Sequence, residues 1–201
     1  MWGRSILSAL SIAAVACSTA PAYTQTTPNE EARLRRGDVV ARIVRESGPG
    51  GRLLAAIDIP AAPSVVWSVM LDCARAPAYV PGLDSCRVVE ATTDGSSDIR
   101  EHRIRWIALL PKLTLRFRSS YIAEQEIRVT RISGDLAAME GAWRLEPLNE
   151  GRATRLHYDF RIVPSTLLPS GLVRAGLLRD TPKVLEAVRT EVARVAARQS
   201  R

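Results

Sequence analysis

Residues that could perform chemistry are few in this chain. It contains two histidines, His102 and His157, and three cysteines, of which Cys73 and Cys86 lie in the central part. Neither of these cysteines stands in a CxxC or metal-ligand spacing, so neither redox nor zinc chemistry is indicated. The sequence shows no Ser/His/Asp set, phosphate-binding glycine loop or nucleotide-binding fingerprint. It therefore predicts no catalytic residue, no metal ligand and no cofactor.

The remaining reactive groups allow two interpretations each. Asp58 and Asp72 stand near the rim of a predicted pocket and could act as acids, but their positions at a strand end and a helix end favour structural roles. Cys73 and Cys86 are an even pair, which can form a disulfide in an oxidising compartment. Closing that loop would stabilise the fold by about 3 kcal/mol. Two free, buried thiols are the alternative.

The N-terminus predicts export to the periplasm or the cell exterior. Residues 1–22 combine a short positive start, an apolar run from Ile6 to Ala16 and a small-residue exit at Ala20-Pro21-Ala22, as in a secretory signal peptide. The run is shorter than the roughly 20 residues of a membrane span. An uncleaved anchor, or a lipoprotein attached through Cys17, ranks below cleavage. Residues 23–36 are polar and without periodicity, so we expect a flexible lead-in.

Charge alone does not identify a partner. The chain has 28 Lys and Arg against 21 Asp and Glu, a formal net charge of +7. A basic protein can bind nucleic acid or anionic lipid, but here the arginines are dispersed over many predicted strands, which favours a solvated sheet face. Export also removes most nucleic-acid partners, so none is predicted. Docking of the Arg-rich face on a membrane or partner is a further hypothesis.

Periodicity predicts the elements that position these groups. The segments 38–46 and 52–60 bracket a glycine-rich turn and indicate a hairpin, and a short helix over 61–72 and a second one before Pro81-Gly82 follow. In KLTLRFRSSY, Leu113, Leu115, Phe117 and Tyr121 share one face, and this period of two predicts an antiparallel sheet with one dry and one wet face. By the same alternation His157 faces solvent. The predicted strands are 84–93, 97–109, 112–125, 127–133, 137–147 and 153–163.

The chain should end in a long amphipathic helix that covers the dry face. Val184, Val188, Val192 and Val195 form an apolar stripe at helical spacing. The sequence Asp180-Thr181-Pro182 resembles a cap followed by a proline, so we expect a kink or break there.

The order and motifs of these elements resemble the START-like or SRPBCC superfamily, in its polyketide cyclase/dehydrase and lipid-transport branch, which includes coenzyme-Q-binding proteins. Segment 59–91 is similar to the opening of that fold, with a Val-Trp helix, an aspartate and a Pro-Gly. Segment 141–164 resembles its late hairpin, and segment 168–194 its closing helix. The resemblance covers residues 37–198. It implies one helix-grip domain over 37–199, an antiparallel sheet wrapped around a long C-terminal helix, with two short helices after the first strands.

The resemblance also implies an apolar cavity between the sheet and the long helix. We expect the cavity to bind or transport a hydrophobic small molecule such as a lipid, quinone or aromatic compound, without catalysis; a cyclase/aromatase-type enzyme using the same cavity is the alternative. Segment 165–178 could gate the cavity or contact a membrane surface transiently. Oligomeric state is left open. The predicted ligand-binding residues are Trp67, Trp106, Leu113, Leu115, Phe117, Tyr121, Met139, Trp143, Leu145, Leu156, Tyr158 and Phe160.

Overall fold

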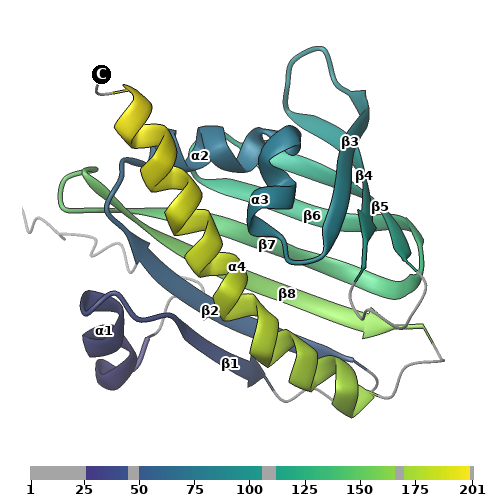
Figure 1. The fold of residues 1–201 in the computed structure, drawn as a ribbon, viewed down its shortest axis with the longest axis horizontal. Helices are drawn as coiled ribbons and strands as arrows, with labels where there is room; N and C mark the ends of the chain where they lie inside the picture. The colour runs from purple at the N-terminus through teal and green to yellow at the C-terminus, as the bar shows by residue number, and fades with distance from the viewer. Residues whose placement is uncertain (1–25, 45–49, 106–111, 166–169, 200–201) are drawn as a thin grey trace, which may run out of the picture.

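An eight-stranded antiparallel sheet forms the body of the protein and curves around one long helix (Figure 1). This computed structural model describes residues 26–44, 50–105, 112–165 and 170–199. The sheet order is β1-β2-β8-β7-β6-β5-β4-β3, so the first hairpin joins the last strand and the remaining strands run consecutively. The strands are β1 (Val40–Val44), β2 (Gly51–Ile59), β3 (Leu83–Ala91), β4 (Ser97–Ile104), β5 (Leu113–Ile122), β6 (Glu126–Gly134), β7 (Leu136–Leu148) and β8 (Ala153–Pro164).

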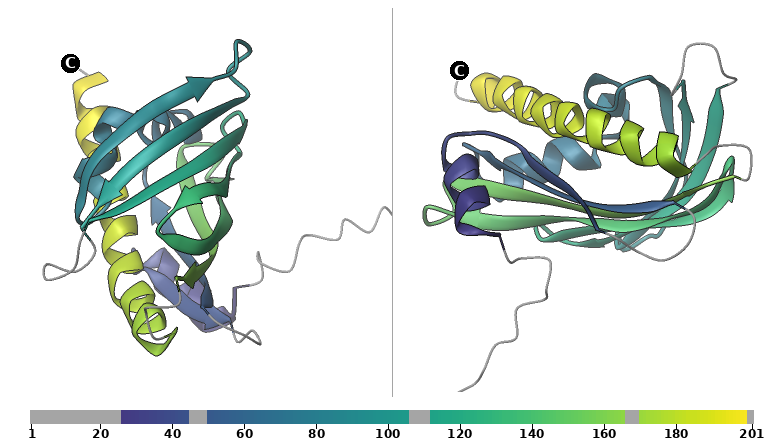
Figure 2. Two further views of the ribbon diagram at one scale, coloured as in Figure 1. Left: turned by 90° about the vertical axis from the view of Figure 1, so that its right-hand side faces the viewer. Right: turned by 90° about the horizontal axis from the view of Figure 1, so that it is seen from below.

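The predicted helix-grip architecture is confirmed. The two short helices are α2 (Pro63–Leu71) and α3 (Ala76–Tyr79), joined by the 3-10 turn η2 (Cys73–Arg75). Helix α4 (Ser170–Gln199) lies along the concave side of the sheet (Figure 2). Its residues Leu185, Val188 and Val192 are fully buried in the core, as the apolar stripe predicted. No helix in the described ranges is long and apolar enough to cross a membrane.

The break expected near Pro182 does not occur, because α4 continues through this residue. A proline inside a helix deprives the carbonyl four residues earlier of its donor. That residue is Leu178, whose side chain is 42% exposed, so it lies on the solvent side, where water can satisfy the carbonyl. Leu177, before the proline, packs with Leu53 and Val173, and Leu185, after it, is buried in the main core, so both halves of α4 are held against the sheet.

The expected flexible lead-in instead contains helix α1 (Pro28–Arg35). Thr27 caps it through a capping box with Glu30, in which each side chain accepts a hydrogen bond from the other residue's backbone N–H. The helix is polar and buries little beyond Leu34, which packs against Val40 and Ala56. Glu31 forms two hydrogen bonds with Arg155, of 2.7 and 3.0 Å. Capping and the ion pairs of Glu31 with Arg155 and of Glu30 with Arg42, rather than an apolar stripe, hold this helix on the sheet.

The prediction that His157 faces solvent is wrong, because the outer face of the sheet is covered near helix α1. His157 lies on the outer face of β8, but it is only 7% exposed. It pairs in register with Ala56, the residue that Leu34 of α1 covers. Its Nε2 atom lies 2.7 Å from a carboxylate oxygen of Glu146. The outer face is therefore partly covered near β8 rather than uniformly wet.

The two cysteines form a disulfide between the end of α2 and strand β3. Cys73 and Cys86 are bonded, with their Cα atoms 5.4 Å apart. The enclosed segment carries α3 and the turn at Gly82, which form one wall of the region under α4. At Gly82 the backbone has φ of +74°, and a Cβ there would lie 2.3 Å from the carbonyl oxygen of Arg105. This position therefore suits glycine.

Candidate functional site: the cavity under the long helix

Two adjoining chambers lie between the sheet and α4. The mouth chamber has a volume of about 320 Å³ and is lined by the turn 80–82, the ends of β4 and β5, and α4 residues between Gly176 and Val184. The deep chamber has about 190 Å³ and extends over β5 to β8 towards α2 and α3. Both are lined by Val80, His102, Leu115, Met139, Tyr158, Ile162 and Val184. The two chambers therefore adjoin along these shared residues.

Seven of the twelve predicted ligand-binding residues line these chambers: Leu113, Leu115, Phe117, Met139, Trp143, Tyr158 and Phe160. Three of their rings form a continuous layer. The Tyr158 and Phe160 rings stack with centroids 4.5 Å apart, and Trp143 meets Tyr158 edge-on at 4.8 Å. Contact of these residues with a ligand remains a prediction.

Four other predicted residues are not among those that line the two chambers. Trp67 and Tyr121 contact each other edge-on, with ring centroids 6.0 Å apart, and pack against the core that contains Phe117. Leu145 and Leu156 belong to the packed core, and Leu156 is fully buried. Trp106 lies outside the described residues.

Sequence reasoning missed the polar side chains inside the cavity. Arg100, His102 and Ser119 line the deep chamber from β4 and β5. Their inward direction follows from strand register, since Arg100 pairs with Phe117 and His102 with Leu115. Because inward-facing β4 residues are mostly polar, the strand lacks the apolar alternation that would have revealed its inner face.

The Arg100 guanidinium is held by groups around the chamber. Its Nε donates to both carboxylate oxygens of Asp98, at 3.0 and 3.1 Å. Its Nη2 donates to the Leu71 carbonyl and the Tyr121 hydroxyl, each at 2.9 Å, and its Nη1 to the Met70 carbonyl at 3.4 Å. Arg100 and Asp98 are 7% and 8% exposed. This buried pair fastens the end of α2 to the sheet and leaves the chamber wall without net charge.

His102 differs because its Nε2 atom is buried and has no hydrogen-bond partner in the described part of the chain. Its ring stands edge-on to Phe117, with centroids 4.7 Å apart. Burial, with a smaller contribution from Arg100, lowers the pKa of His102 to about 4. The imidazole is therefore neutral at physiological pH.

Tyrosines near the cavity stay protonated for the same reason. Burial raises the pKa of Tyr121 to about 12. Burial also raises the pKa of Tyr158, and a hydrogen bond with Thr181 opposes that shift.

The two acids considered from the sequence have structural partners instead. Asp72 accepts from the Ala74 N–H at the start of η2, and Asp58 accepts from Arg155 at 2.7 Å.

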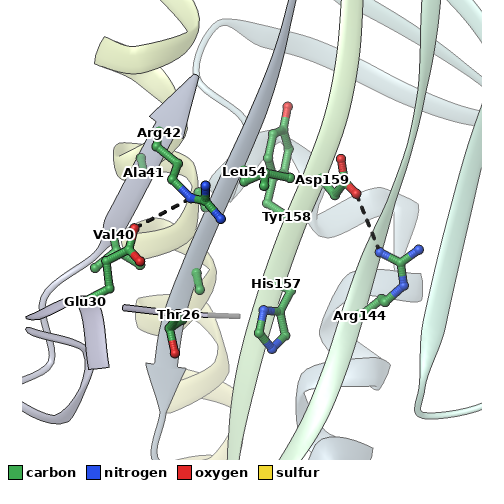
Figure 3. A pocket seen from close by; sticks show the side chains of 12 residues that line it. Thr26, Glu30, Val40, Ala41, Arg42, Leu54, Arg144, His157, Tyr158 and Asp159 are labelled. Atoms are coloured by element: carbon green, nitrogen blue, oxygen red, sulfur yellow. Dashed lines mark ion pairs between the residues drawn. The ribbon is translucent and has the colours of Figure 1, made fainter. Parts of the chain in front are cut away.

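A small hollow lies on the outer face, between α1 and strands β1, β2, β7 and β8 (Figure 3). Glu30 and Arg42 form an ion pair of 3.6 Å on one side of it, and Arg144 and Asp159 one of 3.9 Å on the other. Its volume is about 30 Å³, which accommodates about two water molecules. It is therefore too small for an organic ligand. In the described part of the chain, no group of three His, Cys, Asp or Glu side chains is arranged to bind a metal ion.

Comparison with known families fits this geometry. The family described as polyketide cyclase / dehydrase and lipid transport matches residues 59–189. The chain belongs to this family. The match begins at the end of β2 and includes the chamber residues of β4 to β8 and the first two thirds of α4. No curated protein matches the sequence.

Solved structures share the fold at low sequence identity. The lipid transfer and protein localization domain of human StarD13 has a TM-score of 0.66 and 16% identity, over 76% of this chain and 83% of that one. A STAR-related lipid transfer protein from Xanthomonas axonopodis has a TM-score of 0.65 and 17% identity, over 77% and 93%. The Zhui aromatase/cyclase from Streptomyces sp. R1128 has a TM-score of 0.62 and 16% identity, over 77% and 95%. Binding proteins and enzymes both use this fold, so fold alone does not choose between them.

Proposed function

We propose that the protein binds and carries a hydrophobic small molecule in the cavity under α4. The observation that supports this proposal is the mouth chamber, which has a volume of about 320 Å³ and adjoins the deep chamber. Ligand sites are typically apolar clefts of about 300–1,000 Å³ with a few polar groups, and this space fits that description. A lipid-like, quinone or aromatic ligand matches its aliphatic and aromatic walls.

Catalysis in the same cavity is the second candidate, because His102 and Arg100 reach the deep chamber. A general base works best when its pKa lies near the working pH, whereas the pKa of His102 is about 4. Arg100 is already engaged by Asp98, Tyr121 and two backbone carbonyls. These groups suit binding better than proton transfer.

Blocking the cavity tests the proposal. Val184 lines both chambers from α4, and V184W would place a large ring in them. Lys183 is its neighbour on the outer side of the helix, with 60% of its side chain exposed, so K183W is the matched control. Delipidated protein should take up a neutral fluorescent probe such as N-phenyl-1-naphthylamine, V184W should take up little, and K183W should resemble wild type. Folding of each variant is checked by near-UV circular dichroism.

Uptake that V184W leaves unchanged would place the ligand elsewhere and contradict the proposal. Native mass spectrometry of gently purified protein provides an independent measurement, because a carrier should retain an apolar ligand. A protein that retains none and takes up no lipid or quinone would refute the binding function.

Export and transient membrane contact belong to the same proposal. Export is supported by the N-terminal sequence pattern, and sequencing of the mature N-terminus should show that residues 1–22 have been removed. Membrane contact is supported by Leu172 and Leu178, which are 52% and 42% exposed on the first turns of α4, where the stretch that lines the mouth chamber begins at Gly176. Co-sedimentation with phosphatidylglycerol vesicles should decrease in L172S/L178S; equal binding by this variant and wild type would contradict a membrane role for these leucines.

A further inference from the structure

The deep chamber contains a polar atom whose hydrogen-bonding capacity is unused. His102 Nε2 is buried and unpartnered within the described ranges, on a ring that lines both chambers. Leaving such a group unsatisfied destabilises the folded protein. A ligand that hydrogen bonds to it would recover part of that cost. His102 therefore marks the point where a ligand's polar group is favoured.

The charge that lines the deep chamber is compensated. It belongs to Arg100, and Asp98 lies 3.0 Å from the Nε of Arg100. At the mouth, Arg179 and Asp180 form an ion pair of 2.7 Å, and the exposed Arg105 also lines the chamber. A carboxylate ligand would lose its hydration in the deep chamber without gaining an uncompensated positive charge, which is costly. The deep chamber therefore disfavours an ionised ligand.

We propose that His102 is the ligand's hydrogen-bonding anchor, and that the ligand is an uncharged, mostly apolar molecule carrying a hydroxyl or carbonyl group. This inference rests on the proposed binding function and names its ligand class. A neutral imidazole nitrogen either accepts from a hydroxyl or donates to a carbonyl, depending on its tautomer. Since His102 lies where the chambers meet, the polar group would sit near Leu115 and Tyr158, which line the same junction. The apolar part would fill the remaining space.

A matched ligand series tests this assignment at pH 7.5. 1-Decanol, decane and decanoate share a chain and differ in having a hydroxyl, no polar group or a carboxylate. Each competes with N-phenyl-1-naphthylamine for wild type, H102F, H102Q and H157Q. The H102F variant keeps an aromatic ring but removes the nitrogen, and H102Q restores a hydrogen-bonding group. H157Q changes the other histidine, which lies on the outer face of the sheet.

Wild type should bind decanol more tightly than decane or decanoate. H102F should weaken decanol binding about five-fold, the effect of one lost hydrogen bond, and leave decane unchanged. H102Q should recover part of the loss, and H157Q should match wild type. If the decanol-to-decane preference is the same in wild type, H102F and H102Q, or decanoate binds most tightly, this inference is wrong while the cavity function stands. If neither the fluorescent compound nor any competitor binds wild type, the proposed function fails as well.

Discussion

Replacing His102 with phenylalanine should remove a specific part of the protein's acid sensitivity. In the folded protein the pKa of His102 is about 4, compared with its ordinary value of 6.5. Between pH 4 and pH 6.5, His102 is therefore protonated in the unfolded chain but neutral in the folded protein. The contribution of His102 to the free energy of unfolding is therefore fully present above pH 6.5 and is lost as the pH falls towards 4.

The two pKa values determine the magnitude. Their difference corresponds to a limit of about 3 kcal/mol. Between pH 7.5 and 4.5, linkage gives a loss of about 2.5 kcal/mol from this group alone. Carboxylates titrate in the same interval, but they are common to wild type and H102F, so the difference between the two proteins isolates the histidine.

Urea denaturation of delipidated wild type, H102F and H157Q at half-unit pH steps measures this effect. The free energy of unfolding of wild type should fall by about 2.5 kcal/mol more than that of H102F over this interval. H157Q should follow wild type, because it retains His102. Parallel curves for wild type and H102F would show that His102 titrates normally, and would refute its burial as a neutral base inside the cavity.

Three further variants, all measured by urea denaturation, test a tight contact in the sheet, a buried ion-pair network and the disulfide. In G141V the new Cβ would lie 2.2 Å from the Asp159 carbonyl oxygen and 2.6 Å from Phe160 Cγ, so we expect the free energy of unfolding to fall by at least about 2 kcal/mol. The control G171A, at an open helical position, should be as stable as wild type. Equal stabilities of G141V and G171A would contradict the close approach of β7 and β8. R155M removes the arginine that pairs with Asp58 and Glu31 at 2.7 Å and should lower the free energy of unfolding by about 2–3 kcal/mol. The control R87M, at an ion pair whose arginine is 66% exposed, should lower it by under about 1 kcal/mol. Similar losses in the two variants would refute the importance of the Arg155 ion pairs. C73S/C86S should lose about 3 kcal/mol relative to oxidised wild type, whereas no change would show that the disulfide is absent from the purified protein.

The fold could be predicted because its apolar residues repeat with the period of each element. In β5, Leu115 and Phe117 alternate with polar residues and both are buried. In α4, Val188 and Val192 recur at helical spacing and are fully buried. Helix α1 could not be found by this criterion because only Leu34 is buried along its length. Its signal was the Thr27-x-x-Glu30 capping box, a local hydrogen-bond pattern that hydrophobic periodicity does not detect.

The polar interior of the cavity escaped prediction for a related reason. Strand β4 directs Asp98, Arg100 and His102 inward, and the alternation rule assigns such residues to solvent. Only the pairing of β4 with β5 fixes its phase, by placing Arg100 opposite Phe117 and His102 opposite Leu115. An apolar cavity that must also orient a ligand needs a few inward polar residues, and these are the residues that weaken the pattern identifying an inner face. In a fold of this kind, a strand whose alternation fails next to a strand that alternates well, as β4 does beside β5, is therefore the place to look for ligand-orienting groups.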